Sequence, residues 1–160
     1  ADFFEDGEKV TEFLVCAQKD KHSASLQRIQ IIKGSITNSG ARPSEKVFDV
    51  VCSDGLKVDP TTHRCPDNGA RVNIEDCSIT SNVGATELKA TWRDPEFNPK
   101  DKAFYYVRVL ENPTCRWSTW DALKAGIKPR SDLHETIQER AWSSPIWYIP
   151  VPEDIDIFAL

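Results

Sequence analysis

Short stretches in which hydrophobic and polar residues alternate recur along this chain, and a period of two is the pattern of β-strands. The most regular alternation runs over residues 85–93. Leu88, Ala90 and Trp92 occupy one face there, and the intervening positions are charged or polar. The pattern predicts a strand with one buried and one solvated face. Further strands are expected at residues 9–17, 26–33, 45–52, 71–79 and 142–149.

The stretch 26–33 predicts another half-buried strand. Ile29 and Ile31 are expected to face a core. Arg28 and Gln30 alternate with them and are expected to face solvent.

Residues 103–110 carry apolar side chains on both faces, so the chain is organised around them. Such a strand belongs in the middle of a sheet rather than at its edge. Arg108 is the only charged residue inside it, and we expect this side chain to find a partner or to reach the rim. Pro113 ends the strand because proline has no N–H for the ladder.

The pattern changes after this strand. Ser118 and Asp121 have the spacing of a capping box, and Gly126 stands where a helix C-terminal cap would be. These signals predict a short helix over about 119–125. Hydrophobic residues four positions apart predict a second short helix around 132–140.

About seven strands with little helix predict an all-β fold, an antiparallel β-sandwich of the immunoglobulin-like type with one or two short helices near the C-terminus. With 160 residues, the chain is expected to form a single domain, 1–160. It contains no methionine, not even at position 1. We therefore expect it to be a C-terminal fragment of a longer protein or a chain whose leader was removed.

Composition narrows the range of partners. The hydrophobic fraction of 39% and the charged fraction of 28% are ordinary for a soluble globular protein. A formal net charge of -5 argues against nucleic acid and anionic membranes, because both need a basic face. No apolar run approaches the roughly 18 residues that a membrane span needs.

Oxygen-bearing side chains suggest two weak metal sites. Asp54, Asp59 and Asp67 lie in a loop rich in the oxygen ligands that calcium prefers, although aspartate beside glycine or proline is also what turns select. Asp132 and His134 have a spacing that recurs in metallohydrolases, but a metal needs three or four converging ligands. Polar turns are the simpler interpretation of both, so we expect no cofactor and no catalytic residue.

Four tryptophans gather in the last third of the chain: Trp117, Trp120, Trp142 and Trp147. Tryptophans beside strands most often close a core or cover a domain interface, and we expect Trp142 and Trp147 to be largely buried. The alternative is an aromatic platform that binds carbohydrate.

The chain has five cysteines and no CxxC pair, so the usual zinc and thioredoxin spacings are absent. An odd number leaves at least one thiol free. Cys16 ends an apolar run and is expected to be that thiol, buried as a small hydrophobe.

Several stretches are specific enough to resemble a known family: LQRIQIIKG (26–34), EKVFDV (45–50), WRDPEFNP (92–99), AFYYVRVLENPTCRWSTWDA (103–122) and IQERAWSSPIWY (137–148). They resemble the C-terminal part of a bacterial family catalogued as domain of unknown function thirty-six-oh-four. The resemblance implies exported proteins whose N-terminal part is similar to PHP-type (polymerase and histidinol phosphatase) metallohydrolases. The histidine-rich metal motifs belong to that N-terminal part, so no ligand role is implied for Asp132 or His134.

The resemblance also bears on the remaining cysteines. Members of the family often lack cysteine at these positions, which implies that the four entered as two bonded pairs, in keeping with export. Sequence alone leaves three pairings open. The expected strand topology favours Cys52–Cys65, which would staple the longest irregular region, and Cys77–Cys115, which would span neighbouring strands or the two sheets.

These observations predict a non-catalytic accessory domain that packs against the N-terminal domain of the same protein in the periplasm or outside the cell. The alternative is a module that binds carbohydrate or calcium on its own.

Overall fold

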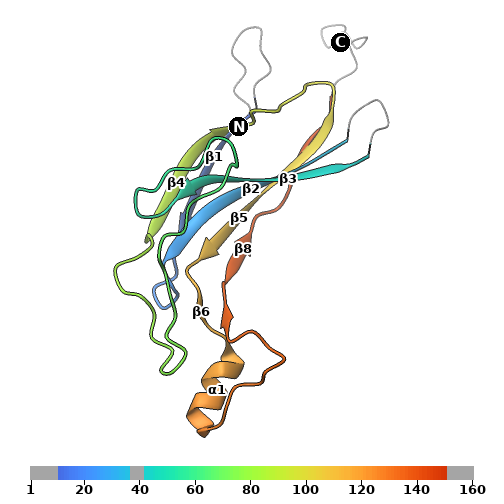
Figure 1. Cartoon of the computed structure of the whole chain (residues 1–160). Helices are drawn as coiled ribbons and strands as arrows, with labels where there is room; N and C mark the ends of the chain where they lie inside the picture. The colour runs from blue at the N-terminus through green and yellow to red at the C-terminus, as the bar shows by residue number, and fades with distance from the viewer. Residues whose placement is uncertain (1–10, 37–41, 151–160) are drawn as a thin grey trace, which may run out of the picture.

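The computed structural model describes residues 11–36 and 42–150. Within them the chain is mostly β, its sheets are antiparallel, and there is one short helix, which confirms the predicted structural class (Figure 1). The predicted start of the first strand at residue 9 lies outside the described residues. The strands are β1 Glu12–Gln18, β2 Leu26–Ile36, β3 Ser44–Cys52, β4 Glu87–Arg93, β5 Lys102–Glu111, β6 Thr114–Cys115, β7 Thr136–Ile137, β8 Arg140–Trp142 and β9 Ile146–Tyr148.

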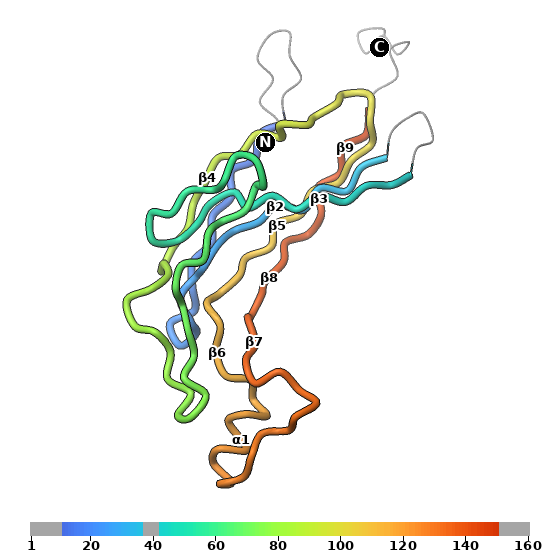
Figure 2. The backbone as a smooth tube through the Cα atoms, viewed as in Figure 1, coloured from blue at the N-terminus to red at the C-terminus, as the bar shows by residue number. Residues whose placement is uncertain are grey.

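A five-stranded sheet forms the centre of the molecule. Its order is β3-β2-β5-β8, and β9 also pairs with β5 (Figure 2). β5 therefore has neighbours on both sides, as the apolar residues on both its faces predict. The strand ends at Glu111, just before Pro113, as expected.

β1 and β4 form a two-stranded ribbon that packs against one face of this sheet. Val15 and Leu88 from the ribbon meet Ile29, Ile31 and Tyr105 from the sheet in a core of buried side chains. Burying large apolar side chains in this way contributes roughly 1.5–3 kcal/mol each.

The predicted solvent face of β2 is wrong. Gln30 is buried and Arg28 is half-buried, although both were expected to face water. The reason is the position of the strand, because β2 lies between β3 and β5 and consecutive residues along it are buried, which leaves neither face solvated. The polar groups on it are bonded to neighbours, as burial requires.

Three local predictions are also wrong. Residues 71–79 make only the single bridge Val72–Ile79, because turns occupy most of the segment. Residues 132–140 contain turns and β7 instead of a helix. The observed helix, α1, spans Trp117–Ala125 and begins after Arg116, so Ser118 lies inside it and no side chain caps its start.

The end of α1 agrees with prediction. Gly126 is left-handed, with φ of 66°, and its N–H bonds the Leu123 carbonyl 3.1 Å away. Glycine adopts this conformation without the steric penalty that other residues incur.

The long connection between β3 and β4 is held by covalent bonds. Cys52–Cys65 and Cys77–Cys115 are both bonded, as expected, with Cα–Cα distances of 5.7 and 5.6 Å. Cys16 is the free thiol, but it is exposed, because it lies on the outer face of the β1–β4 ribbon and not on the core face. Among the described residues, no helix has the length and hydrophobicity needed to cross a bilayer.

Candidate functional site

The four tryptophans lie in two separate places. Trp117 and Trp120 belong to α1, while Trp142 and Trp147 belong to β8 and β9. The expected burial of Trp142 and Trp147 is wrong, since 59% and 66% of their surfaces are exposed. β8 and β9 pair with only one neighbour, β5, and nothing described covers the face from which these indoles project.

The first surface is a helical knob, formed by the exposed side chains of Trp117, Trp120 and Ile127 at and just beyond α1. Figure 1 shows α1 projecting beyond the sheets at the end of the molecule. Only Thr119 and Ala122 of the helix are buried. The knob is held mainly by bonds at its base, where the Thr119 hydroxyl donates to the Glu135 carbonyl over 2.8 Å.

The second surface is a sheet platform, made of Phe104, Tyr106, Trp142 and Trp147. The Phe104 and Tyr106 rings are nearly parallel, with 10° between their planes and 6.4 Å between their centroids. Trp147 is the register partner of Phe104, and their rings lie 5.3 Å apart. The rings of Phe104, Tyr106 and Trp147 therefore form one continuous surface. Trp142 is the register partner of Arg108, and because cross-strand partners point to the same face it lies on this face too.

A polar network adjoins the sheet platform. The register places Asp49, Gln30, Arg108 and Trp142 in one row across four strands. The Gln30 amide donates to Asp49 Oδ1 over 2.6 Å, and Arg108 Nε donates to Gln30 Oε1 over 2.7 Å. Arg108 thus has the partner that its position in β5 predicts.

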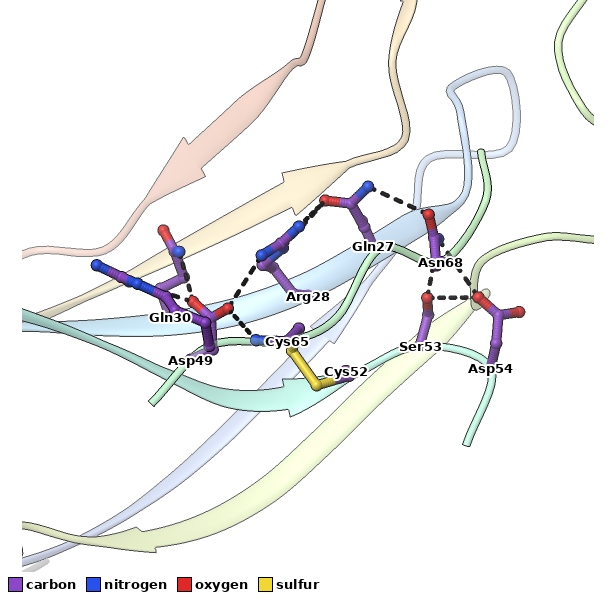
Figure 3. The surroundings of a disulfide bond; sticks show 10 residues. Gln27, Arg28, Gln30, Asp49, Cys52, Ser53, Asp54, Cys65 and Asn68 are labelled. Carbon is purple, nitrogen blue, oxygen red and sulfur yellow. Dashed lines mark hydrogen bonds and ion pairs between the residues drawn. A yellow bond between two sulfur atoms is a disulfide. The ribbon is translucent and has the colours of Figure 1, made fainter. Parts of the chain in front are cut away.

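Asp49 is the centre of this network, and its side chain has no exposed surface. Arg28 NH1 lies 3.0 Å from Asp49 Oδ2, and the Cys65 backbone N–H donates to the same oxygen over 2.6 Å (Figure 3). Arg64 NH1 is 3.6 Å from the other oxygen. The carboxylate therefore ties the disulfide-closed loop to the sheet, and four charged or polar groups compensate its burial.

The aspartates considered for calcium do not converge. Asp54 accepts the Gly84 N–H over 2.9 Å, and Asp59 accepts the Thr61 and Thr62 N–H groups at 2.9 and 2.7 Å. Asp67 pairs with Arg71 over 2.5 Å, and the hydrogen bonds of that guanidinium lower the Asp67 pKa to about 2. In residues 11–36 and 42–150 no three acidic, histidine or cysteine side chains are grouped to hold a metal.

Asp132 and His134 do not form a site either. Asp132 is exposed and lies 2.7 Å from Arg130, which lowers the pKa of its carboxyl below the usual value. His134 is exposed in the same connection and shares no described bond with Asp132. Both oxygens of the carboxylate accept hydrogen bonds from Arg130, two residues away.

A buried polar cluster lies on the opposite face of the sheet. Asp94 Oδ2 accepts the Tyr105 hydroxyl over 2.7 Å and lies 2.5 Å from Lys33 Nζ. Burial and the Asp94 carboxylate raise the pKa of Tyr105 above its ordinary value. A cavity of about 150 Å³ lies beside this cluster, between Lys33, Lys46 and Asn98. Each charged group of the cluster has a partner, so it stabilises the sheet and leaves no free group for chemistry.

Sequence reasoning singled out Trp142 and Trp147 of the sheet platform, but it did not place Phe104, Tyr106 or the neighbouring arginines on a surface with them. Phe104, Tyr106 and Arg108 do show a signal, because they stand at alternate positions of one strand. We interpreted that face as core, since nothing in the sequence tells a covered apolar face from an open one.

Within the described residues this chain is β-rich, with antiparallel sheets, two disulfides and two exposed aromatic surfaces, and no group of side chains there could hold a metal ion. Over residues 1–150 the chain matches the family described as "Protein of unknown function (DUF3604)", and it belongs to that family. This match confirms the family that the sequence motifs indicate. No curated protein and no solved structure matches it.

Proposed function

We propose that this chain is a non-catalytic accessory domain that packs against another domain of the same protein through the helical knob. The observation that supports it is the exposure of Trp117, Trp120 and Ile127 on a helix that buries little of its own surface. Large apolar side chains that cluster in water mark an interaction surface.

The helix itself supports the proposal. A nine-residue helix is marginal in water, so most of its stability must come from packing. Arg116, at its start, has a buried Nε with no described hydrogen-bond partner. A buried donor without an acceptor costs about 1–3 kcal/mol, which further lowers the stability of the helix in the isolated chain.

Fold type and location belong to the same proposal. The β1–β4 ribbon over one face of the five-stranded sheet favours an immunoglobulin-like β-sandwich. Two disulfides favour an exported protein, because bonded cysteines persist in oxidising compartments. The neighbouring domain would be the PHP-like N-terminal part that the family resemblance implies.

Hydrogen–deuterium exchange in the full-length protein tests the docking surface. Backbone amides of α1 should exchange at least tenfold more slowly there than in the 160-residue chain. Replacing Trp117 and Trp120 together by alanine should abolish the protection, while Trp147→Ala, an equally exposed indole elsewhere, should not. Equal exchange of α1 in the two proteins would refute docking at the helical knob.

The non-catalytic part of the proposal has its own test. We expect the 160-residue chain to hydrolyse no phosphate or carboxylate ester with Mn²⁺ or Zn²⁺ present, because no described acid, base and nucleophile converge. Turnover that Asp132→Ala or His134→Ala abolished would contradict this expectation.

A second candidate function is carbohydrate binding at the sheet platform. It is favoured by the near-parallel Phe104 and Tyr106 rings beside the open indoles of Trp142 and Trp147. Calcium binding has no comparable support, because the aspartates considered for it are bonded to turns and to Arg71.

A further inference from the structure

We infer that the sheet platform binds a polysaccharide whose sugar rings carry carboxylates, a polyuronate. This inference rests on the second candidate function and names its ligand class. Two features of one sheet face carry it, the aromatic surface and the arginines beside it.

The aromatic surface is open and extended. Trp142 and Trp147 expose more than half of their surfaces, and Phe104 and Tyr106 lie between them along β5. From the row of Phe104 to the row of Arg108 the strand covers about 13 Å, which spans more than one sugar ring. Flat aromatic rings offer an apolar stacking surface, and the C–H face of a pyranose is the matching surface on a sugar.

The position of the Phe104 ring depends on Gly34. These two residues are register partners, and a Cβ at Gly34 would lie 2.2 Å from the ring. The ring therefore occupies the space that a side chain would take, in line with Tyr106. Any larger residue at Gly34 must displace the ring from the platform.

An arginine cluster adjoins the platform: Arg28, Arg64, Arg108 and Arg140. Arg28 and Arg64 share the buried carboxylate of Asp49, whereas Arg108 and Arg140 have no ion pair among the described residues. The guanidinium groups of the cluster therefore outnumber the carboxylate that they contact, on a protein whose net charge is -5. Arg108 uses only its Nε, and its terminal nitrogens have no acceptor among the described residues. Arg140 is exposed, and its register partner Leu110 places it on the same face. Free guanidinium groups bind carboxylates through paired hydrogen bonds.

The shape of the face favours a polysaccharide over an acidic peptide. Peptide side chains are held in pockets that exclude water. The described cavity, between Lys33 and Asn98, lies on the opposite face of the sheet. A chain of flat rings with charged edges needs no pocket, only a stacking surface and donors at its border.

Affinity electrophoresis or calorimetry on the 160-residue chain tests the inference, with polygalacturonate as the probe. Neutral dextran and polyglutamate serve as comparison ligands. We expect polygalacturonate to bind at least tenfold more tightly than either one. Raising the salt concentration should weaken this binding, because it screens the arginines.

Variants separate the contribution of the aromatic rings to binding from that of the arginines. Trp147→Ala, Gly34→Val and Arg140→Gln should each weaken binding of polygalacturonate at least fivefold, and Trp117→Ala on the helical knob should leave it unchanged. Arg108→Gln should act like Arg140→Gln, and the exposed Arg140 keeps the test valid if the Arg108 variant misfolds.

Equal binding of dextran would overturn the carboxylate preference while leaving carbohydrate binding in place. Equal binding of polyglutamate, or no binding of any polysaccharide, would overturn the inference, and the latter also removes the second candidate function.

Discussion

Asp49 and Asp67 are chemically identical side chains in opposite surroundings. Asp49 has no exposed surface and is bonded to Arg28, Gln30 and the Cys65 N–H. Asp67 is 60% exposed and is paired only locally, with Arg71 and its own turn. Removing one member of a buried network leaves the remaining polar and charged groups without a partner and shielded from water. In an exposed pair, water replaces the lost partner.

We therefore predict that Asp49→Ala lowers the free energy of unfolding by about 3–5 kcal/mol. Asp67→Ala, the matched control, should lower it far less, because water replaces the partner of an exposed ion pair. Urea unfolding followed by tryptophan fluorescence measures both. Similar losses for the two variants would show that the network around Asp49 is not needed for stability.

Tyr105 is expected to make the free energy of unfolding fall at alkaline pH. Its pKa is raised in the folded state by burial and by Asp94, while in the unfolded chain it is about 10. Above that pH the unfolded chain releases a proton that the folded chain keeps, so stability is lost as the pH rises. The slope due to this residue should be at most about 1.4 kcal/mol per pH unit.

Urea unfolding at pH 9, 10 and 11 should show this slope in a Cys16→Ser background, which prevents thiolate attack on the disulfides. Tyr105→Phe should be less stable at pH 9 and should lose less stability between pH 10 and 11. If the free energy of unfolding fell equally with pH in the two proteins, Tyr105 would not be the cause of the loss of stability at high pH.

At the scale of elements, the sequence predicts the strands with the strongest patterns best. β4 and β5 lie where their alternation predicts, because a period of two directly reflects the faces of a strand. The alternation over Glu87–Arg93 predicts one solvated face, and exposed positions do alternate with less exposed ones along this strand. The turn region 53–86 has no strand, although one was predicted at 71–79, and its density of aspartate, asparagine and glycine explains why turns prevail there.

Predictions failed where tertiary packing overrides local signals. Gln30 looked solvent-exposed because it is polar, but the sheet supplies Asp49 and Arg108 as partners. Trp142 looked buried because it is large, but its strand has an open face. The Trp117–Ala125 helix starts two residues earlier than its capping signal, since Arg116 bonds to the Glu135 carbonyl and fixes that end. Such partners lie far apart in sequence, so no local pattern contains them.

The disulfides yield a prediction for the segments that they join. In the chain-entropy model, removing Cys52–Cys65 by a double alanine replacement should cost about 3 kcal/mol, and removing Cys77–Cys115 about 4 kcal/mol. The second bridge closes the longer loop, 38 residues against 13, so its loss should be the larger. Urea unfolding of the two double variants measures the order, and a larger loss for the shorter loop would contradict the entropic explanation.

The whole molecule carries its two aromatic surfaces at opposite ends of β5. β9, with Trp147, pairs with the start of the strand at Phe104, while α1 follows its end through β6 (Figure 2). Both surfaces lie outside the core formed by the ribbon and the sheet. Binding at one surface therefore leaves the other open.

This separation predicts that the exposed indoles contribute little to folding. Trp117→Ala and Trp147→Ala should each change the free energy of unfolding by less than about 1 kcal/mol. Leu88→Ala, in the core, should lower it by about 2–5 kcal/mol. Thermal unfolding monitored by circular dichroism compares the three, and a large loss at either tryptophan would place that residue in the core.

The loop that Cys52–Cys65 closes affects how the protein responds to proteolysis. Residues 53–64 contain no strand and include exposed positions such as Lys57 and Arg64, which trypsin recognises. A cut after Lys57 would open the backbone, yet both new ends would stay joined through the sulfur bridge and through the contacts of Asp49. The nicked protein would keep its mass on a non-reducing gel and separate into two fragments only after reduction.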